Sequence, residues 1–164
     1  MEGVKNEPWF DRTIFIFTSD HGGGDALNPV AREYRPDDKA LAAIEHLRIP
    51  LIIYAPKIFE PKEVKTLGGH NDIFPTIVDM LGLKAEITTM GSSLFDKDVN
   101  ERFVYFYAGN LIGLITNSGY IKYNFKDIVE KNAPNENLID AMKKLLFAVD
   151  TAEAQLLEKN RWAK

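Results

Sequence analysis

An aspartate and a histidine stand next to each other where an apolar run meets three glycines. Asp20 and His21 follow residues 13–18 (TIFIFT), and residues 22–24 are all glycine. A carboxylate oxygen and an imidazole nitrogen both bind divalent ions such as zinc or manganese, and glycines let the backbone approach a bound group. A helix N-cap aspartate beside a hydrogen-bonded surface histidine is the alternative. The dipeptide is compatible with both structures.

Three further residues in the first half of the chain are considered as candidates for a role in the site. Lys39 and His46 lie in the segment of residues 39–47, and we take them as candidate catalytic residues. Both residue types are also common on ordinary surfaces, where their apolar stems cover neighbouring groups. His70 follows two glycines, so it either faces the site or hydrogen-bonds its own loop, and the structural role is favoured.

The elements that position these groups follow from the apolar pattern. Residues 13–18 are β-branched and aromatic, which predicts a buried strand that brings Asp20 and His21 to the carboxyl edge of a sheet. Open α/β sheets bind their ligands at that edge. Residues 49–55 form a second apolar run and predict a neighbouring strand. Residues 25–38 predict an irregular loop, and residues 39–47 predict a short helix or a loop with one helical turn.

A helix is predicted after the loop of residues 57–69. Asn71 or Asp72 is its N-cap, it runs to about Leu81, and Gly82 ends it. The helical spacing predicts a buried stripe composed of Ile73, Ile77, Val78 and Leu81.

The pattern changes after residue 102. Short apolar runs separated by Gly and Asn turns predict an antiparallel meander with strands over residues 103–107, 111–116 and 120–123. Residues 126–130 predict a brief helix, and residues 136–161 a long amphipathic helix that packs against the meander. The apolar face of that helix consists of Leu138, Met142, Leu145, Val149, Ala152 and Leu156.

Composition excludes several classes of protein. The 164 residues are 45% hydrophobic and show no composition shift, which predicts one domain or part of one. Twenty basic residues are scattered among 24 acidic ones, so no basic stripe is present for nucleic acid. The absence of cysteine excludes disulfides, thiolate ligands and a cysteine nucleophile, and no Gly-x-Ser-x-Gly elbow occurs. No apolar run approaches the roughly 20 residues of a membrane span.

Three motifs in fixed order carry a family resemblance. Residues 9–22 (WFDRTIFIFTSDHG), 47–56 (LRIPLIIYAP) and 70–82 (HNDIFPTIVDMLG) together resemble the sulfatase-like branch of the alkaline phosphatase superfamily. The similarity is greatest to the lipoteichoic acid synthase and phosphoglycerol transferase group, which includes proteins of the bacterial cell envelope. It covers residues 8–95 clearly and the strands of the meander more loosely.

This resemblance implies an α/β fold, the C-terminal part of an alkaline-phosphatase-like sandwich. Parallel strands with helices would be followed by a small antiparallel meander and a long C-terminal helix. Residues 1–164 would form a single partial catalytic domain. Within it, residues 8–95 would be the α/β part with half of a metal site, and residues 102–164 the antiparallel strands with the C-terminal helix.

The resemblance also implies roles for individual residues. Asp20 and His21 would ligate a divalent ion, Mn, Zn, Mg or Ca, in the complete enzyme. Arylsulfatases typically have asparagine where this chain has His21, so the histidine favours phosphate esters over sulfate esters as substrates. Lys39 precedes the second strand, where arylsulfatases place a substrate-binding lysine. Lipoteichoic acid synthases tend to have glutamine at the position of His70, so that residue is not expected to be a required ligand.

Other parts of such an enzyme are not found in this chain. The family's nucleophile and the acidic ligand that begins the metal site lie upstream of the three motifs, and residues 25–45 lack the further histidine that relatives often have. We therefore expect a C-terminal fragment that is inactive by itself. The parent is expected to be membrane-anchored through upstream segments, with its catalytic domain outside the cytoplasm.

The competing interpretation is a non-enzymatic α/β interaction module or remnant. Asp20 would then cap a loop, and the helix over residues 136–161 would mediate association. In either case two core strands are too few for a doubly wound sheet. We therefore expect a homo-oligomer that forms through exposed sheet edges or through the apolar face of this helix.

Overall fold

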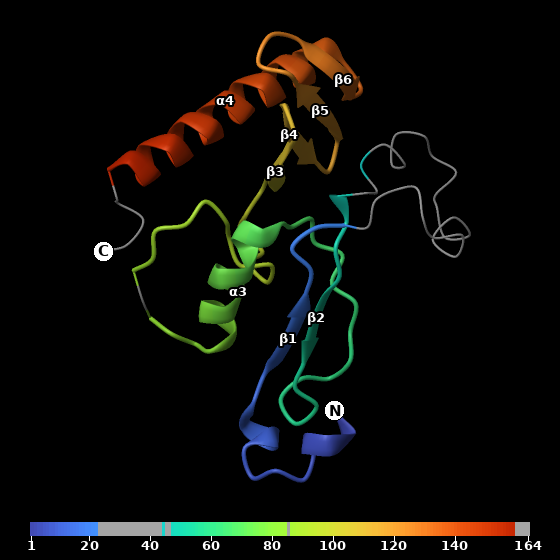
Figure 1. The fold of residues 1–164 in the computed structure, drawn as a ribbon, viewed down its shortest axis with the longest axis vertical. Coiled ribbons are helices and arrows are strands. Elements are labelled where there is room, and N and C mark those ends of the chain that lie inside the picture. The colour runs from blue at the N-terminus through green and yellow to red at the C-terminus, as the bar shows by residue number, and fades with distance from the viewer. Residues whose placement is uncertain (23–43, 45–46, 85, 160–164) are drawn as a thin grey trace, which may run out of the picture. The chain divides into compact units, whose positions relative to one another are not determined.

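A computed structural model describes residues 1–22, 44, 47–84 and 86–159 (Figure 1). The chain divides into two compact units, Met1–Val64 and Lys65–Lys164. The boundary between them falls inside residues 8–95, which we predicted to form one α/β part. Lys39, His46, the predicted loop over residues 25–38 and most of the predicted helix over residues 39–47 lie outside the described residues.

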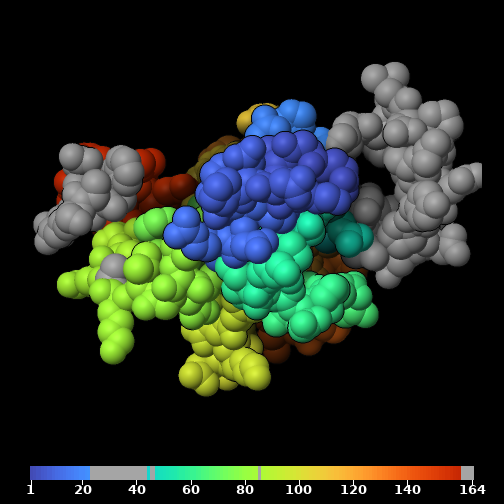
Figure 2. Space-filling model, turned by 90° about the horizontal axis from the view of Figure 1, so that it is seen from below, coloured from blue at the N-terminus to red at the C-terminus, as the bar shows by residue number. Residues whose placement is uncertain are grey.

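The first unit contains two short 3-10 helices and a two-stranded sheet. The helices are η1 (Glu2–Val4) and η2 (Phe10–Arg12), and the strands are β1 (Phe15–Thr18) and β2 (Leu51–Tyr54). Residues near the N-terminus make up a continuous surface of this unit, shown in blue (Figure 2). Phe10 is buried among aromatic rings, and its ring centroid lies 5.4 Å from that of Phe15 and 6.4 Å from that of Tyr54.

The two apolar runs pair with each other as predicted, but the parallel direction that we expected is wrong. Phe15 lies opposite Tyr54 in an antiparallel register. The strands are also less buried than predicted, since Phe17 is 47% exposed and Ile52 is 56% exposed. A continuous apolar run of four residues indicates extended structure but contains no information about strand direction. In this pair the rings of Phe15 and Tyr54, 6.2 Å apart, pack across the antiparallel register.

In the second unit, η4 (His70–Asp72) leads directly into α3 (Ile73–Met80). Gly82, with φ +61°, ends the helix as predicted. The predicted apolar stripe is right only in part: Ile73, Ile77 and Val78 are half-buried, but Leu81 is exposed and the buried residues of α3 are Pro75 and Thr76. Thr76 is buried because its hydroxyl oxygen accepts a hydrogen bond of 2.9 Å from the backbone N–H of Leu94. The helix therefore packs through a polar contact that apolar spacing does not reveal.

Four strands form the meander, β3 (Phe103–Ala108), β4 (Leu111–Thr116), β5 (Gly119–Tyr123) and β6 (Ile128–Asn132). They pair antiparallel in the order β3-β4-β5-β6, which confirms the predicted meander.

Strand β6 replaces the brief helix that we predicted over residues 126–130, and this prediction is wrong. The side-chain oxygen of Asn124 accepts hydrogen bonds from the backbone N–H groups of Lys126 (3.0 Å) and Asp127 (2.7 Å). This Asx turn reverses the chain after β5. The β-branched residues Ile128 and Val129 then favour an extended strand beside β5.

The long helix α4 (Glu136–Glu158) begins where Asn135 accepts a 2.9 Å hydrogen bond from the backbone N–H of Leu138. It packs against the meander as predicted. Met142 and Val149 of the predicted face are buried, but Ile139 and Leu146 are buried as well, so the contact stripe is wider than predicted. The shared core consists of Ile112, Leu114, Ile121, Tyr123, Ile139, Met142 and Leu146. None of the described helices combines the length and the apolar character that a membrane span requires.

Candidate functional site

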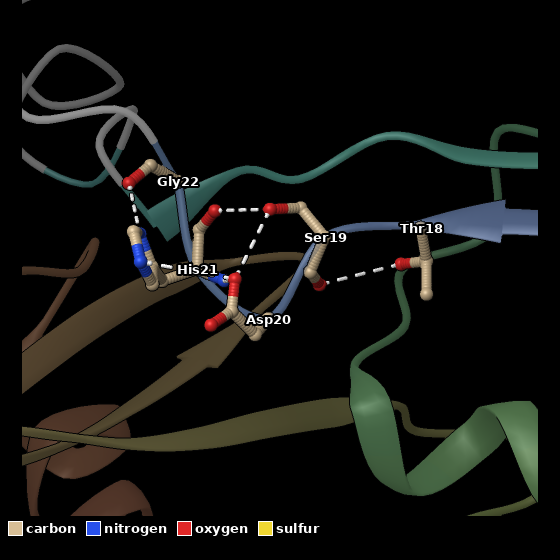
Figure 3. A network of polar contacts seen from close by, with 5 residues as sticks. All are labelled: Thr18, Ser19, Asp20, His21 and Gly22. Carbon is tan, nitrogen blue, oxygen red and sulfur yellow. Dashed lines mark hydrogen bonds and ion pairs between the residues drawn. The ribbon is translucent and has the colours of Figure 1, made fainter.

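Asp20 and His21 lie in a tight turn directly after β1 (Figure 3). The hydroxyl of Ser19 donates a hydrogen bond of 2.7 Å to the backbone carbonyl of His21. The backbone N–H of His21 donates a 3.0 Å hydrogen bond to Oδ1 of Asp20. These short-range bonds orient the carboxylate and fix the path of the backbone at the end of the strand.

The imidazole of His21 is oriented by the next residue. Its Nδ1 lies 2.9 Å from the carbonyl oxygen of Gly22. A carbonyl oxygen only accepts hydrogen bonds, so this contact assigns the proton of the neutral ring to Nδ1. Nε2 then has a lone pair, and it lies 3.7 Å from Oδ1 of Asp20. One carboxylate oxygen and one basic nitrogen therefore lie side by side.

The same contacts raise the pKa of His21 above its ordinary value. The hydrogen bond to the Gly22 carbonyl is the larger cause, and the negative charge of Asp20 adds to it. Both side chains are almost fully solvated, at 81% exposure for His21 and 86% for Asp20. A protonated ring has no lone pair for a metal, so the pair can ligate an ion only when His21 is neutral.

This donor set fits a divalent metal ion. Zinc forms bonds of about 2.1 Å to imidazole nitrogen and to carboxylate oxygen, and the 3.7 Å between Nε2 of His21 and Oδ1 of Asp20 is shorter than two such bonds end to end. Two side chains are fewer than the roughly four ligands that zinc takes. Within the part of the chain that the structure describes, no group of three or more His, Cys, Asp or Glu side chains is placed to hold a metal. Asp20 and His21 could thus supply two ligands.

The other candidates lie in other parts of the chain. Lys39 and His46 lie outside the described residues, and their catalytic role stays a prediction. His70 is exposed at the first position of η4, in the second unit.

Asp72 has a role that the sequence analysis did not find. We predicted it or Asn71 as a helix cap, but the carboxylate of Asp72 makes no capping hydrogen bond to α3. It is buried, and it accepts hydrogen bonds of 2.8 Å from the backbone N–H groups of both Gly69 and Ser92. Sequence spacing gives no signal for the contact with Ser92, because the two residues are twenty positions apart.

Comparison with known proteins supports the resemblance. Residues 2–83, half of the chain, match the sulfatase family model. The lipoteichoic acid synthase-like protein YvgJ of Bacillus subtilis (strain 168) is 28% identical over 101 residues, which cover 58% of this chain and 16% of that protein. Arylsulfatase K of Xenopus laevis is 31% identical over 83 residues, covering 51% of this chain and 14% of that protein. Arylsulfatase K of Rattus norvegicus is 30% identical over 89 residues, which cover 54% of this chain and 15% of that protein.

A solved structure supports the fold. The crystal structure of a protein in the alkaline phosphatase superfamily from Vibrio parahaemolyticus matches 99% of this chain and 39% of its own chain, with a TM-score of 0.71 at 19% identity. This confirms the predicted α/β class with its antiparallel meander and C-terminal helix. The matched segments cover a small part of the full length of the curated relatives. With half of its residues matching the family model, the chain belongs to the sulfatase family.

Proposed function

We propose that this chain contributes Asp20 and His21 as metal ligands to the catalytic site of an enzyme that cleaves or transfers phosphate or sulfate esters. The observation that carries the proposal is the geometry after β1. There the lone pair of His21 Nε2 lies 3.7 Å from a carboxylate oxygen of Asp20, and the Gly22 carbonyl contact favours the tautomer that ligation requires.

Backbone groups of Gly22 and His21 orient the two proposed ligands. Gly22 holds the proton of the neutral ring on Nδ1, and the backbone N–H of His21 orients the Asp20 carboxylate toward Nε2. A divalent ion held by the pair would polarise an ester oxygen and lower the pKa of a hydroxyl nucleophile. The two ligands here are half of a usual site, so the remaining ligands and the nucleophile would come from other parts of the catalytic domain.

The substrate class is an ester of phosphate or sulfate. The relatives include proteins described as lipoteichoic acid synthase-like and as arylsulfatase, and membership in the sulfatase family supports esters of this kind. The histidine at position 21 favours phosphate over sulfate. A membrane-anchored parent with an extracytoplasmic catalytic domain would suit the lipoteichoic acid synthase-like relative. We do not expect the 164 residues alone to hydrolyse p-nitrophenyl phosphate or sulfate, because two ligands hold a divalent ion too weakly to activate a nucleophile.

Calorimetric titration of the chain with zinc and with manganese tests the proposed ligands. We expect weak binding, with a dissociation constant above about 1 μM because the site has only two ligands. His21→Ala and Asp20→Ala should abolish this binding. His70→Ala, which removes another exposed histidine, should leave it unchanged. Binding that is lost with His70→Ala but retained with His21→Ala would refute the assignment.

A further inference from the structure

The turn between β5 and β6 lies beside α4 (Figure 1). Two exposed phenylalanines there contact the ring of a buried tyrosine. The ring centroid of Tyr123 lies 6.4 Å from that of Phe125 and 5.1 Å from that of Phe147. Tyr123 belongs to the core, whereas Phe125 is 60% exposed and Phe147 is 36% exposed. We call Phe125, Phe147 and the neighbouring Lys126 and Lys143 the aromatic patch.

The backbone at Phe125 is held in a conformation that its side chain disfavours. Its φ is +68°, and no other non-glycine residue among those described has a positive φ. Asparagine and glycine adopt this left-handed conformation readily, but a bulky residue is strained in it. The turn enforces the strain, because Asn124 binds the N–H groups of Lys126 and Asp127 with its side chain. Phe125 contacts the ring of Tyr123, but most of its side chain is exposed on a strained backbone, and this combination favours a role in binding.

The lysines of the patch form no ion pair with a carboxylate of the described residues. The ammonium of Lys143 lies over the rings of Tyr123 and Phe147, 5.2 Å and 5.8 Å from their centroids. Of the ion pairs between described residues, none includes Lys143 or Lys126. An ammonium that packs on aromatic rings remains available to an anion. The patch therefore combines apolar rings with two lysines that make no ion pair within the described part of the chain, beside the exposed Asp127.

We propose that the aromatic patch docks on the surface of an anionic lipid bilayer. Aromatic side chains that enter the headgroup region beside lysines that bind anionic headgroups are typical of interfacial binding surfaces. The backbone donors of Lys126 and Asp127 are already used by Asn124, so this turn offers them to no added peptide strand. This surface goes beyond the proposed catalytic role, and none of its residues belongs to the Asp20 and His21 site.

Co-sedimentation with vesicles tests the proposal. The chain is mixed with vesicles of equal parts phosphatidylglycerol and phosphatidylcholine, and separately with vesicles of phosphatidylcholine alone. We expect binding to the anionic vesicles only. Phe125→Asn should lower the partition coefficient at least about tenfold, because a buried phenyl ring is lost. Lys143→Gln should lower it about fivefold, because one cation near the anionic surface is lost.

Thermal unfolding separates docking from a structural role. Asparagine suits the left-handed backbone, so Phe125→Asn should leave the melting temperature unchanged or raise it while vesicle binding falls. Leu157→Gln is the control, because Leu157 lies in the same unit and is 61% exposed. The Leu157→Gln variant should bind vesicles as strongly as the unaltered chain does. Equal binding by Phe125→Asn, or no binding to either vesicle, would overturn the proposal. A dimer that dissociates with Phe125→Asn would assign the patch to a second copy and also overturn it.

Discussion

The carboxylate of Asp72 accepts a hydrogen bond of 2.8 Å from the backbone N–H of Ser92, twenty residues later in the chain. Its other oxygen accepts a bond of the same length from the N–H of Gly69. Asp72 thus ties two loops to the start of α3. The loop that contains Gly91 and Ser92 lies very close to the backbone of Asn71. At Gly91 the carbonyl of Asn71 leaves no room for a Cβ atom.

We expect Asp72→Asn to destabilise the second unit by about 2–4 kcal/mol. Asparagine keeps the shape of the side chain but has only one acceptor oxygen. Its NH₂ group would therefore face a part-buried backbone N–H that has lost its partner. The midpoint of urea unfolding measures the loss. Asp98→Asn is the control, because Asp98 is exposed, and it should shift stability by less than about 0.5 kcal/mol. Equal midpoints for the two variants would show that the carboxylate is not needed.

Two tyrosines of β3 bind carboxylates of α4. The hydroxyl of Tyr105 donates to Glu153 at 2.9 Å, and that of Tyr107 donates to Asp150 at 2.7 Å. Burial, together with the hydrogen bond to Glu153, raises the pKa of Tyr105 to about 12. Burial and the hydrogen bond to Asp150 also raise the pKa of Tyr107.

These raised pKa values predict a loss of stability at alkaline pH. A tyrosine of the unfolded chain ionises near pH 10, so the folded state holds the phenol proton more tightly than the unfolded state does. The stabilisation is complete below about pH 10 and is lost as the pH rises toward 12. Tyr105→Phe should therefore be less stable than the unaltered chain at pH 7, and the difference should shrink between pH 10 and 12. A difference that stays constant in urea unfolding across this range would contradict the assignment.

The contact between α4 and the meander depends on Leu146, which is 1% exposed in the shared core. Leu146→Ala should cost about 2–5 kcal/mol, since it removes buried methyl groups and leaves a cavity. Leu157→Ala makes the same change at an exposed position of the same helix and should cost less than about 0.5 kcal/mol. Equal losses in chemical unfolding would mean that the helix is not held by this core.

The sequence predicts the meander well because its signals are local. Turn glycines such as Gly109, with φ +62°, separate apolar runs at short intervals, and each strand pairs with its neighbour in the chain. Strand β6 was missed because charged residues surround Ile128 and Val129, and the turn at Asn124 that directs it depends on side-chain hydrogen bonds. The predicted direction of β2 relative to β1 was wrong, because an apolar run contains no information about strand direction.

In the candidate site, too, local contacts follow from the sequence and contacts between distant residues do not. The turn that holds Asp20 and His21 is local, because the contacts that orient them come from Ser19, Gly22 and each other, and their role as metal ligands stays a prediction. The link between Asp72 and Ser92 could not, since its two ends lie twenty residues apart and the donor is a backbone N–H that any residue but proline supplies. The roles of Lys39 and His46 remain predictions.

The last prediction concerns Asp20 in the complete enzyme. The Asp20 side chain is 86% exposed, and its hydrogen bonds come from its neighbours Ser19 and His21, so Asp20→Ala should change the free energy of unfolding by less than about 0.5 kcal/mol. Loss of a metal ligand should lower turnover at least about a thousandfold. Asp11→Ala, at an exposed aspartate of η2, should change neither quantity. Steady-state kinetics on a phosphodiester, with unfolding curves for each variant, measure both effects. Normal turnover by a folded Asp20→Ala enzyme would remove Asp20 from the site.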